Sequence, residues 1–93
     1  MIVGLLTIDL AIFEAQSLKD KRRVIRGLKE RIRGRFNVSV AEIGHANAAK
    51  RCTLGVAMVA ESARPMHGQF DLIVELVRTV GGLTLVDYQR EFF

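Results

Sequence analysis

The residues that follow Met1 constrain the fold more than any other part of the chain. Residues 2–13 are almost continuously apolar, and Asp9 is the single charged residue among them. Apolar side chains occur at both odd and even positions, which is typical of a strand buried on both faces. We therefore expect residues 2–13 to form a central strand of a sheet. The apolar residues expected to share one face of it are Ile2, Leu6, Ile8, Leu10 and Ile12.

A helical period replaces this pattern at Leu18. Ser17 is a favourable N-cap, and Asp20 follows three residues later, close to a capping box. At about 100° per residue the apolar residues of the segment fall on one arc. They are Leu18, Val24, Ile25, Leu28 and Ile32. Gly34 is placed to help end this helix.

The rest of the chain reads as two strands, a second helix and a last strand. Residues 36–43 and 52–60 alternate between the two faces and predict strands on either side of a polar loop. Ser62 is the expected N-cap of the second helix, with Pro65 in its first turn and Gly81-Gly82 at its end. Residues 83–88 predict a fourth strand, and residues 89–93 a mixed polar and aromatic tail.

The order βαββαβ predicts one α+β domain over residues 1–93. Two strand–helix–strand units with right-handed crossovers form a ferredoxin-like sandwich, a four-stranded antiparallel sheet with two helices on one face. The first and third strands are then central, and they are the two most apolar strands of this chain.

The net charge of +4 is distributed unevenly along the sequence. The segment from Lys19 to Arg35 holds nine basic and two acidic residues, a net charge of +7, whereas the remainder holds five basic and eight acidic residues, a net charge of −3. Such asymmetry indicates a partner of opposite charge.

Within this segment the basic residues form a stripe that we expect opposite the apolar arc. Its members repeat at helical spacing, and two further residues flank it: Arg22, Arg26, Lys29 and Arg33, with Lys19 and Arg23 beside them. Such a stripe predicts binding to RNA or a ribonucleoprotein through phosphates and shape, with little base specificity. The alternative is a solvated face whose arginines pair with acidic strand ends such as Glu42 or Glu91.

The face of the sheet away from the helices is expected to be small and semi-apolar. We expect it to include Val3, Leu5, Thr7, Thr53, Gly55, Ala57, Val59, Val86 and Tyr88. An exposed apolar face of this kind commonly marks association, so a homo-oligomer or adaptor module is the rival hypothesis. Scattered surface apolar residues are the alternative. Because the third strand has no aromatic residue, base stacking on the sheet is not expected.

No catalytic, cofactor or metal-binding constellation is recognisable, so we expect a non-enzymatic binding domain without a cofactor. Cys52 is expected to be a buried strand residue, and His67 with Asp71, beside Arg78, a surface pair. The loop from His45 to Arg51 is either an ordinary polar loop or a contact for phosphate or a partner.

Two further expectations concern single features of the first strand and its loop. Asp9, unusual in a central strand, is expected to face the open side of the sheet and pair with a basic residue. A small phosphatase of the acylphosphatase type would share the topology, but it needs a glycine-rich anion cradle that residues 12–23 lack.

The chain is expected to be cytoplasmic and independent of membranes. Asp9 interrupts the longest apolar run, and that run lacks the basic start of a signal peptide. The single cysteine, Cys52, cannot form an internal disulfide, which fits a reducing compartment.

Residues 17–44 together with residues 52–60 resemble the YlxP-like family, short bacterial domains of unknown function. The specific parts are SLKDKRR from Ser17 to Arg23 and NVSVAE from Asn37 to Glu42. The resemblance implies a ferredoxin-like fold and a bacterial cytoplasmic protein. Because family members are often encoded beside transcription and translation factors, it also implies a ribosome- or RNA-associated role. The loop after His45 departs from the family, with Asn47 and Ala49 where an acidic residue and a tryptophan are usual.

Overall fold

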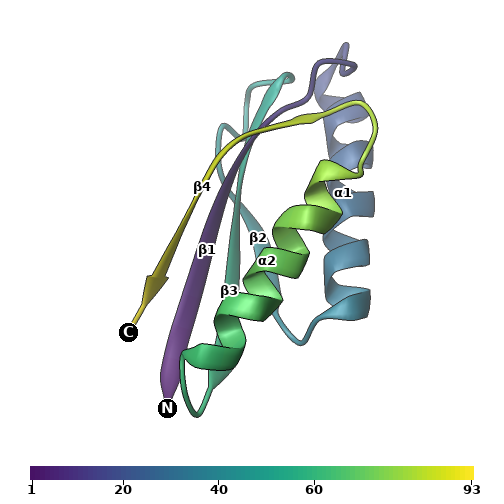
Figure 1. The fold of residues 1–93 in the computed structure, drawn as a ribbon. Helices are drawn as coiled ribbons and strands as arrows, with labels where there is room; N and C mark the ends of the chain where they lie inside the picture. Colours follow the sequence, from purple (N-terminus) through teal and green to yellow (C-terminus); the bar gives the residue numbers. More distant parts are fainter.

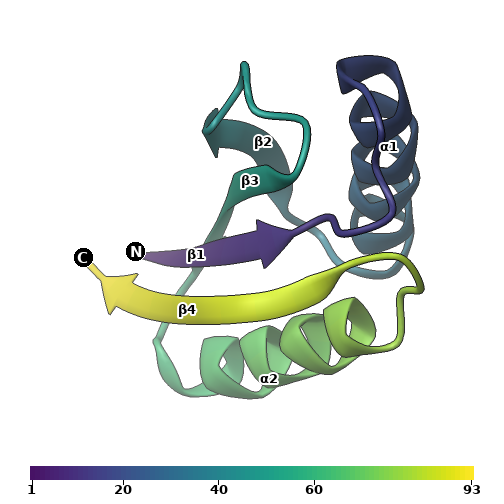
Figure 2. The same ribbon diagram turned by 90° about the horizontal axis from the view of Figure 1, so that it is seen from above.

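The computed structural model describes all residues from 1 to 93 and has the βαββαβ order (Figure 1). Its elements are β1 (Ile2–Ala11), α1 (Leu18–Arg35), β2 (Ser39–Gly44), β3 (Arg51–Ala60), α2 (Arg64–Arg78) and β4 (Thr84–Phe92). The sheet order is β2-β3-β1-β4 with antiparallel neighbours throughout, and both helices lie on one side of it (Figures 1 and 2). The expected α+β ferredoxin-like fold is confirmed. Neither helix is long and apolar enough to cross a membrane.

β1 lies in the middle of the sheet and alternates as expected. Leu6, Ile8 and Leu10 are fully buried toward the helices, while the intervening residues are partly exposed on the open face. The strand ends at Ala11, two residues earlier than expected, because the chain turns directly after it: Ala15 donates its N–H to Ile12 O, and Phe13 in the turn is exposed.

α1 begins as its capping residues predict. The Ser17 side chain accepts from the N–H of Asp20 at 3.1 Å, and the Asp20 carboxylate accepts from the N–H of Gln16 at 3.0 Å. The helix runs to Arg35, and Phe36 caps it through a backbone bond to Ile32 O. Gly34 lies inside the last turn.

The expected N-cap of α2 is wrong by one residue. Ala63, not Ser62, is the N-cap, and it makes no side-chain capping bond. Pro65 in the first turn has no N–H to offer, and the next N–H, that of Met66, already bonds to Ala63 O. A capping hydroxyl would therefore find few backbone N–H groups without a hydrogen-bond partner at the start of α2.

The two edge strands, β2 and β4, begin or end at other residues than expected. β2 begins only at Ser39, because Phe36 and Val38 pack against the core without pairing to β3. β4 begins at Thr84 and continues through the expected tail to Phe92, which pairs with Gly4 of β1. Phe92 also stacks beside Phe70 and His67 of α2, and these contacts account for the extra strand residues.

Candidate nucleic-acid interface

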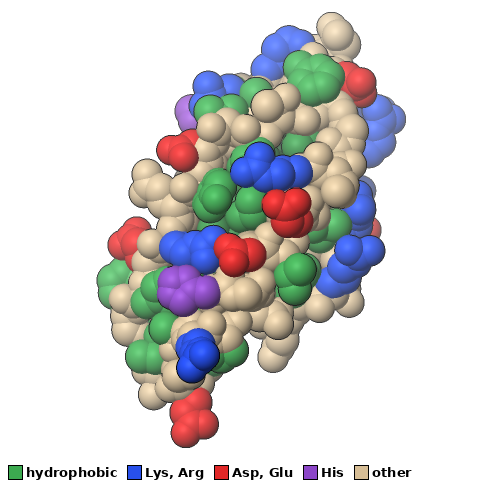
Figure 3. Space-filling view, viewed as in Figure 1, with side chains coloured by type: hydrophobic (Ala, Val, Ile, Leu, Met, Phe, Trp, Pro, Cys, Tyr) green, Lys and Arg blue, Asp and Glu red, His purple; other side chains and the backbone are tan.

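Four basic side chains of α1 surround a hollow on the protein surface. Lys19, Arg22, Arg23 and Arg26 line a concavity of about 260 Å³ to which no other residue contributes. All four side chains are exposed. The one carboxylate within ion-pair distance of any of them is that of Asp20, 3.5 Å from Arg23. In Figure 3 blue side chains gather along the side of the molecule where α1 lies. The hollow therefore offers several unpaired positive charges to one anionic group.

The other two residues of the expected stripe have a different setting. Arg33 donates from Nη2 to Val40 O at 2.7 Å, so its guanidinium is bonded to the backbone of edge strand β2. Lys29 is half-buried, and its charge acts on the nearby Glu42 carboxylate. The stripe thus lies partly along the β2 edge and not wholly opposite the apolar arc. Of the six residues of the expected interface, the four that line the hollow are the ones without such a contact to β2.

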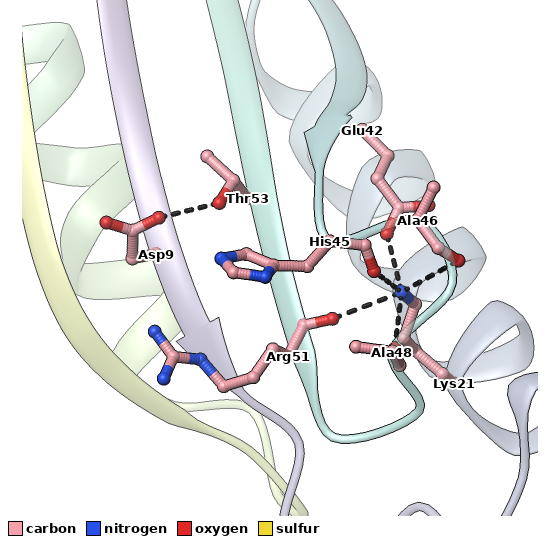
Figure 4. A network of polar contacts seen from close by, with 8 residues as sticks. All are labelled: Asp9, Lys21, Glu42, His45, Ala46, Ala48, Arg51 and Thr53. Carbon is pink, nitrogen blue, oxygen red and sulfur yellow. Dashed lines mark hydrogen bonds and ion pairs between the residues drawn. The ribbon is translucent and has the colours of Figure 1, made fainter.

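Lys21, from the same basic segment, is not on the surface at all. Its side chain is 1% exposed, and its ammonium group lies 2.8 Å from Glu42 Oε2. Four carbonyl oxygens of the β2–β3 loop and the start of β3 also lie within hydrogen-bond distance of Nζ and share its three N–H donors with Glu42 (Figure 4). Those acceptors are His45 O (2.8 Å), Ala46 O (3.5 Å), Ala48 O (2.8 Å) and Arg51 O (3.1 Å). One buried cation therefore fastens this loop to the first turns of α1.

The position of Lys21 in the helical period indicates that it is buried, although a count of charges along the sequence includes it with the surface cations. At about 100° per residue Lys21 projects into the middle of the apolar arc of α1, between Leu28 and Ile32. A lysine in that position must find buried oxygens, because an unpaired buried ammonium is very costly. Its inclusion among the basic residues overstated the charge available for a partner.

The groups around Lys21 have shifted pKa values. Burial alone would raise the pKa of Glu42, but the hydrogen bond and charge of Lys21 and a hydrogen bond with Cys52 outweigh it and hold the pKa below 4.5. Burial, together with the negative charge of Glu42, raises the pKa of the Cys52 thiol to about 12. Cys52 is fully buried, as expected, and it is therefore a neutral thiol at physiological pH.

The backbone of the β2–β3 loop is held by hydrogen bonds, and several of its side chains are polar. His45 adopts φ 62°, a left-handed conformation that a non-glycine residue rarely takes. Its carbonyl bond to Lys21 helps to hold it there. Lys50 donates to Phe13 O at 3.1 Å and so joins the loop to the β1–α1 connection. The imidazole of His45 and the guanidinium of Arg51 extend toward the side of the sheet where Asp9 and Thr53 lie (Figure 4).

Asp9 faces the open side of the sheet, but its expected basic partner is wrong. Its Oδ1 accepts from the hydroxyl of Thr53 at 2.7 Å, and none of the ion pairs of the protein includes it (Figure 4). Thr53 is the direct neighbour of Asp9 in the β1–β3 register, so the hydroxyl is closer than any cation.

The open face carries an apolar hollow. It has a volume of about 320 Å³ and lies over β1, β3 and β2. The residues that line it are Leu5, Leu6, Thr7, Ser39, Ala41, Ile43, Gly55, Val56 and Ala57. Gly55 leaves room for Ile43 to lie across it, since a Cβ there would come within 3.1 Å of Ile43 Cδ1. Of the residues expected here, Val3 is half-buried beside the hollow in β1, and Val59 is exposed at the far end of β3.

The expected place of Tyr88 on this face is wrong. Asp87 pairs with Asp9 and Leu85 pairs with Leu10, so Val86 is an extra residue in a bulge. Beyond the bulge Tyr88 pairs with Ile8, whose side chain points toward the helices. Directly paired residues share a face, so Tyr88 is on the helix side, whereas Asp87 and Glu91 are on the open side. The added residue reverses the alternation that the sequence pattern assumed.

His67 and Asp71 form a surface cluster with a partner other than Arg78. Arg90 of β4 bonds to Asp71 Oδ1 at 2.7 Å and to both Nδ1 and the carbonyl of His67 at 3.3 Å. Arg78 pairs instead with Glu75 at 3.8 Å. The cluster fastens β4 to α2.

Comparison with known proteins identifies the family. A family model described as "Protein of unknown function (DUF503)" matches residues 3–90. The chain belongs to this family. It is also similar to the "Uncharacterized protein YlxP" of Bacillus subtilis (strain 168), with 37% identity over 60 residues. That match covers 64% of this chain and 65% of the relative, slightly less than two thirds of its length. The resemblance to the YlxP-like family is confirmed, and the family description names no activity.

Proposed function

We propose that this DUF503 protein is a non-enzymatic, cytoplasmic domain that binds RNA or a ribonucleoprotein through the exposed basic face of α1. The observation that carries the proposal is the hollow bounded by Lys19, Arg22, Arg23 and Arg26. A phosphate group in that hollow would meet several cations at once, and cations that neutralise phosphates release counterions from the nucleic acid.

The cost of this arrangement to the free protein also supports a function. Arg22 and Arg26 are four residues apart on one helix, so their charges repel each other. Lys19 and Arg22 further lie near the positive end of the helix dipole, where cations are unfavourable. Selection for stability alone gives no reason to keep so many cations together at this end of the helix.

A catalytic role for the start of α1 has less support. The N–H groups of Gln16 and Asp20 are already bonded to the side chains of Asp20 and Ser17. The Asp20 carboxylate therefore lies where an anion cradle would need a phosphate, and it would repel one.

The experiment that tests the proposal compares two charge-reversed variants. Arg22→Glu combined with Arg26→Glu removes the hollow, and Arg64→Glu combined with Arg78→Glu makes the same change in net charge on α2. Binding to a fluorescent RNA is measured by anisotropy at two salt concentrations. The proposal requires the α1 variant to bind much more weakly than the α2 variant. Equal binding by the two variants, with both folded, would rule out α1.

A second candidate, self-association through the open sheet face, is favoured by a separate observation. Ile43 lines the apolar hollow of that face and is 60% exposed, and Val59, farther along β3 on the same face, is 64% exposed. A second copy of the chain would cover them. If so, Ala57→Asp or Val3→Asp dissociates the assembly in light scattering. A wild-type protein that is monomeric throughout the micromolar range excludes this candidate. RNA binding and self-association use opposite sides of the sheet and are compatible.

A further inference from the structure

The kind of RNA that fits α1 follows from the position of the aromatic side chains. Proteins that hold single strands combine a basic groove with aromatic rings on which bases stack. No aromatic residue occurs in α1, and Phe36, directly after it, packs against the core. The basic hollow therefore has no stacking ring on its own helix.

The remaining exposed aromatic residues are poorly placed to help. Tyr88 lies on the helix side of β4, at the opposite edge of the sheet from β2, the strand beside α1. Phe93 lies at the C-terminus, which Figure 1 shows at the end of the molecule away from the β1–α1 connection. Phe13, in that connection and 55% exposed, is the one phenylalanine or tyrosine ring near the start of α1.

The open sheet face would repel an RNA strand. Asp9, Asp87 and Glu91 all belong to this face, since Asp87 pairs with Asp9 and Glu91 pairs with Leu5. Arg51, which pairs with Ala11, is the basic strand residue there. A strand laid across the sheet would thus meet carboxylates, and the one ring beside them is the imidazole of His45 at the end of the face (Figure 4). The RNA would therefore contact the protein through its phosphates, at the basic residues of α1.

A contact made of phosphates alone favours a double helix. Stacking contributes about 1–3 kcal/mol per base to single-strand binding, and a flexible strand bound without it still loses conformational freedom. A duplex instead presents rigid rows of phosphates at high charge density, which a rigid helix can match. The four residues of the hollow span about 10 Å along α1, enough for a few neighbouring phosphates.

We infer that the ligand of the α1 hollow is the sugar–phosphate backbone of double-helical RNA, bound by shape and charge without base readout. This inference rests on the proposed function, since it names the form of RNA that the same face takes.

The test uses an RNA duplex of about 20 base pairs and its two separated strands, each chosen to lack self-pairing, in anisotropy titrations at one salt concentration. The duplex is expected to bind about tenfold more tightly than either strand, as the absence of stacking implies. A second duplex of unrelated sequence is expected to bind equally well. Phe13→Ala is expected to leave all affinities unchanged.

Three results would overturn the inference. One is binding of a single strand as tight as that of the duplex, with Arg22→Glu and Arg26→Glu still abolishing it. The second is a loss of affinity in Phe13→Ala, which would reveal a stacking contact. The third is strong discrimination between the two duplexes. These results leave the proposed function intact, whereas no binding of any RNA overturns both.

Discussion

Lys21 Nζ lies 2.8 Å from Glu42 Oε2, and the same ammonium group is enclosed by carbonyl oxygens of the β2–β3 loop. This ion pair joins the first turns of α1 to β2, the strand at the edge of the sheet. The loop that follows β2 keeps its left-handed turn at His45 beside the same group. One buried ammonium group thus joins the start of α1 both to β2 and to the loop that follows it.

Lys21→Met is expected to destabilise the protein by about 3 kcal/mol, because removing one partner of a buried ion pair leaves the other charge and the carbonyl oxygens unsatisfied. Urea denaturation followed by circular dichroism measures the change. Lys19→Met, at an exposed position two residues away, is the control and is expected to stay within about 0.5 kcal/mol of wild type. Equal stability of the two variants would mean that the buried ammonium contributes nothing to folding.

The protein is expected to lose stability at acidic pH as Glu42 becomes protonated. Its pKa is lowered in the folded protein, so its contribution is complete above its ordinary pKa of 4.5 and is lost as the pH falls through the lowered value. Denaturation midpoints between neutral and strongly acidic pH, compared for wild type and Glu42→Gln, measure this effect. The difference between the two proteins is expected to be constant near neutrality and to shrink below pH 4.5. A constant difference down to strongly acidic pH would contradict this assignment.

Cys52 is expected to resist thiol reagents in the folded protein. It is fully buried, and its pKa of about 12 leaves almost no thiolate at neutral pH. Because this pKa is raised on folding, the contribution of the group to stability is complete below its ordinary value of 9.0 and is lost as the pH rises toward 12. Labelling by a disulfide reagent is expected to be slow in buffer and fast in urea. Rapid labelling in buffer would show that the strand opens readily.

Reversal of charge in α1 is expected to raise stability while it removes binding. Arg22→Glu breaks a like-charge pair with Arg26 and places an acid near the positive end of the helix dipole, so a gain of about 0.5 kcal/mol is expected. Urea denaturation at low salt measures this gain, and high salt is expected to reduce it. A loss of stability would indicate that Arg22 has a structural role, as Arg33 has through its bond to Val40 O.

The fold could be predicted from the sequence because each element has a consistent local pattern. The alternation in β1 and β3, the Ser17 cap and the apolar arc of α1 all agree with the structure. The position of Tyr88 could not be predicted, because a bulge beside Asp9 changes which residues of β4 share a face. Bulges depend on pairing between distant strands, which local alternation does not report.

The basic face was predicted only in part, for a related reason. Charges counted along the sequence include Lys21, which is buried, and Arg33, which is bonded to β2. The contacts of both residues involve β2 or the loop that follows it. Lys21 could have been recognised by its projection into the apolar arc. The bond from Arg33 to Val40 O depends on how edge strand β2 lies beside α1, and the helical period does not contain that information.

We propose that the exposed cations at the start of α1 bind RNA. The salt dependence of RNA affinity tests this for wild type, for Arg22→Glu with Arg26→Glu, and for Arg64→Glu with Arg78→Glu. Wild type and the α2 variant are expected to share a steep dependence on salt, and the α1 variant is expected to bind weakly with a shallower one. The same affinity and slope in all three proteins would contradict the claim.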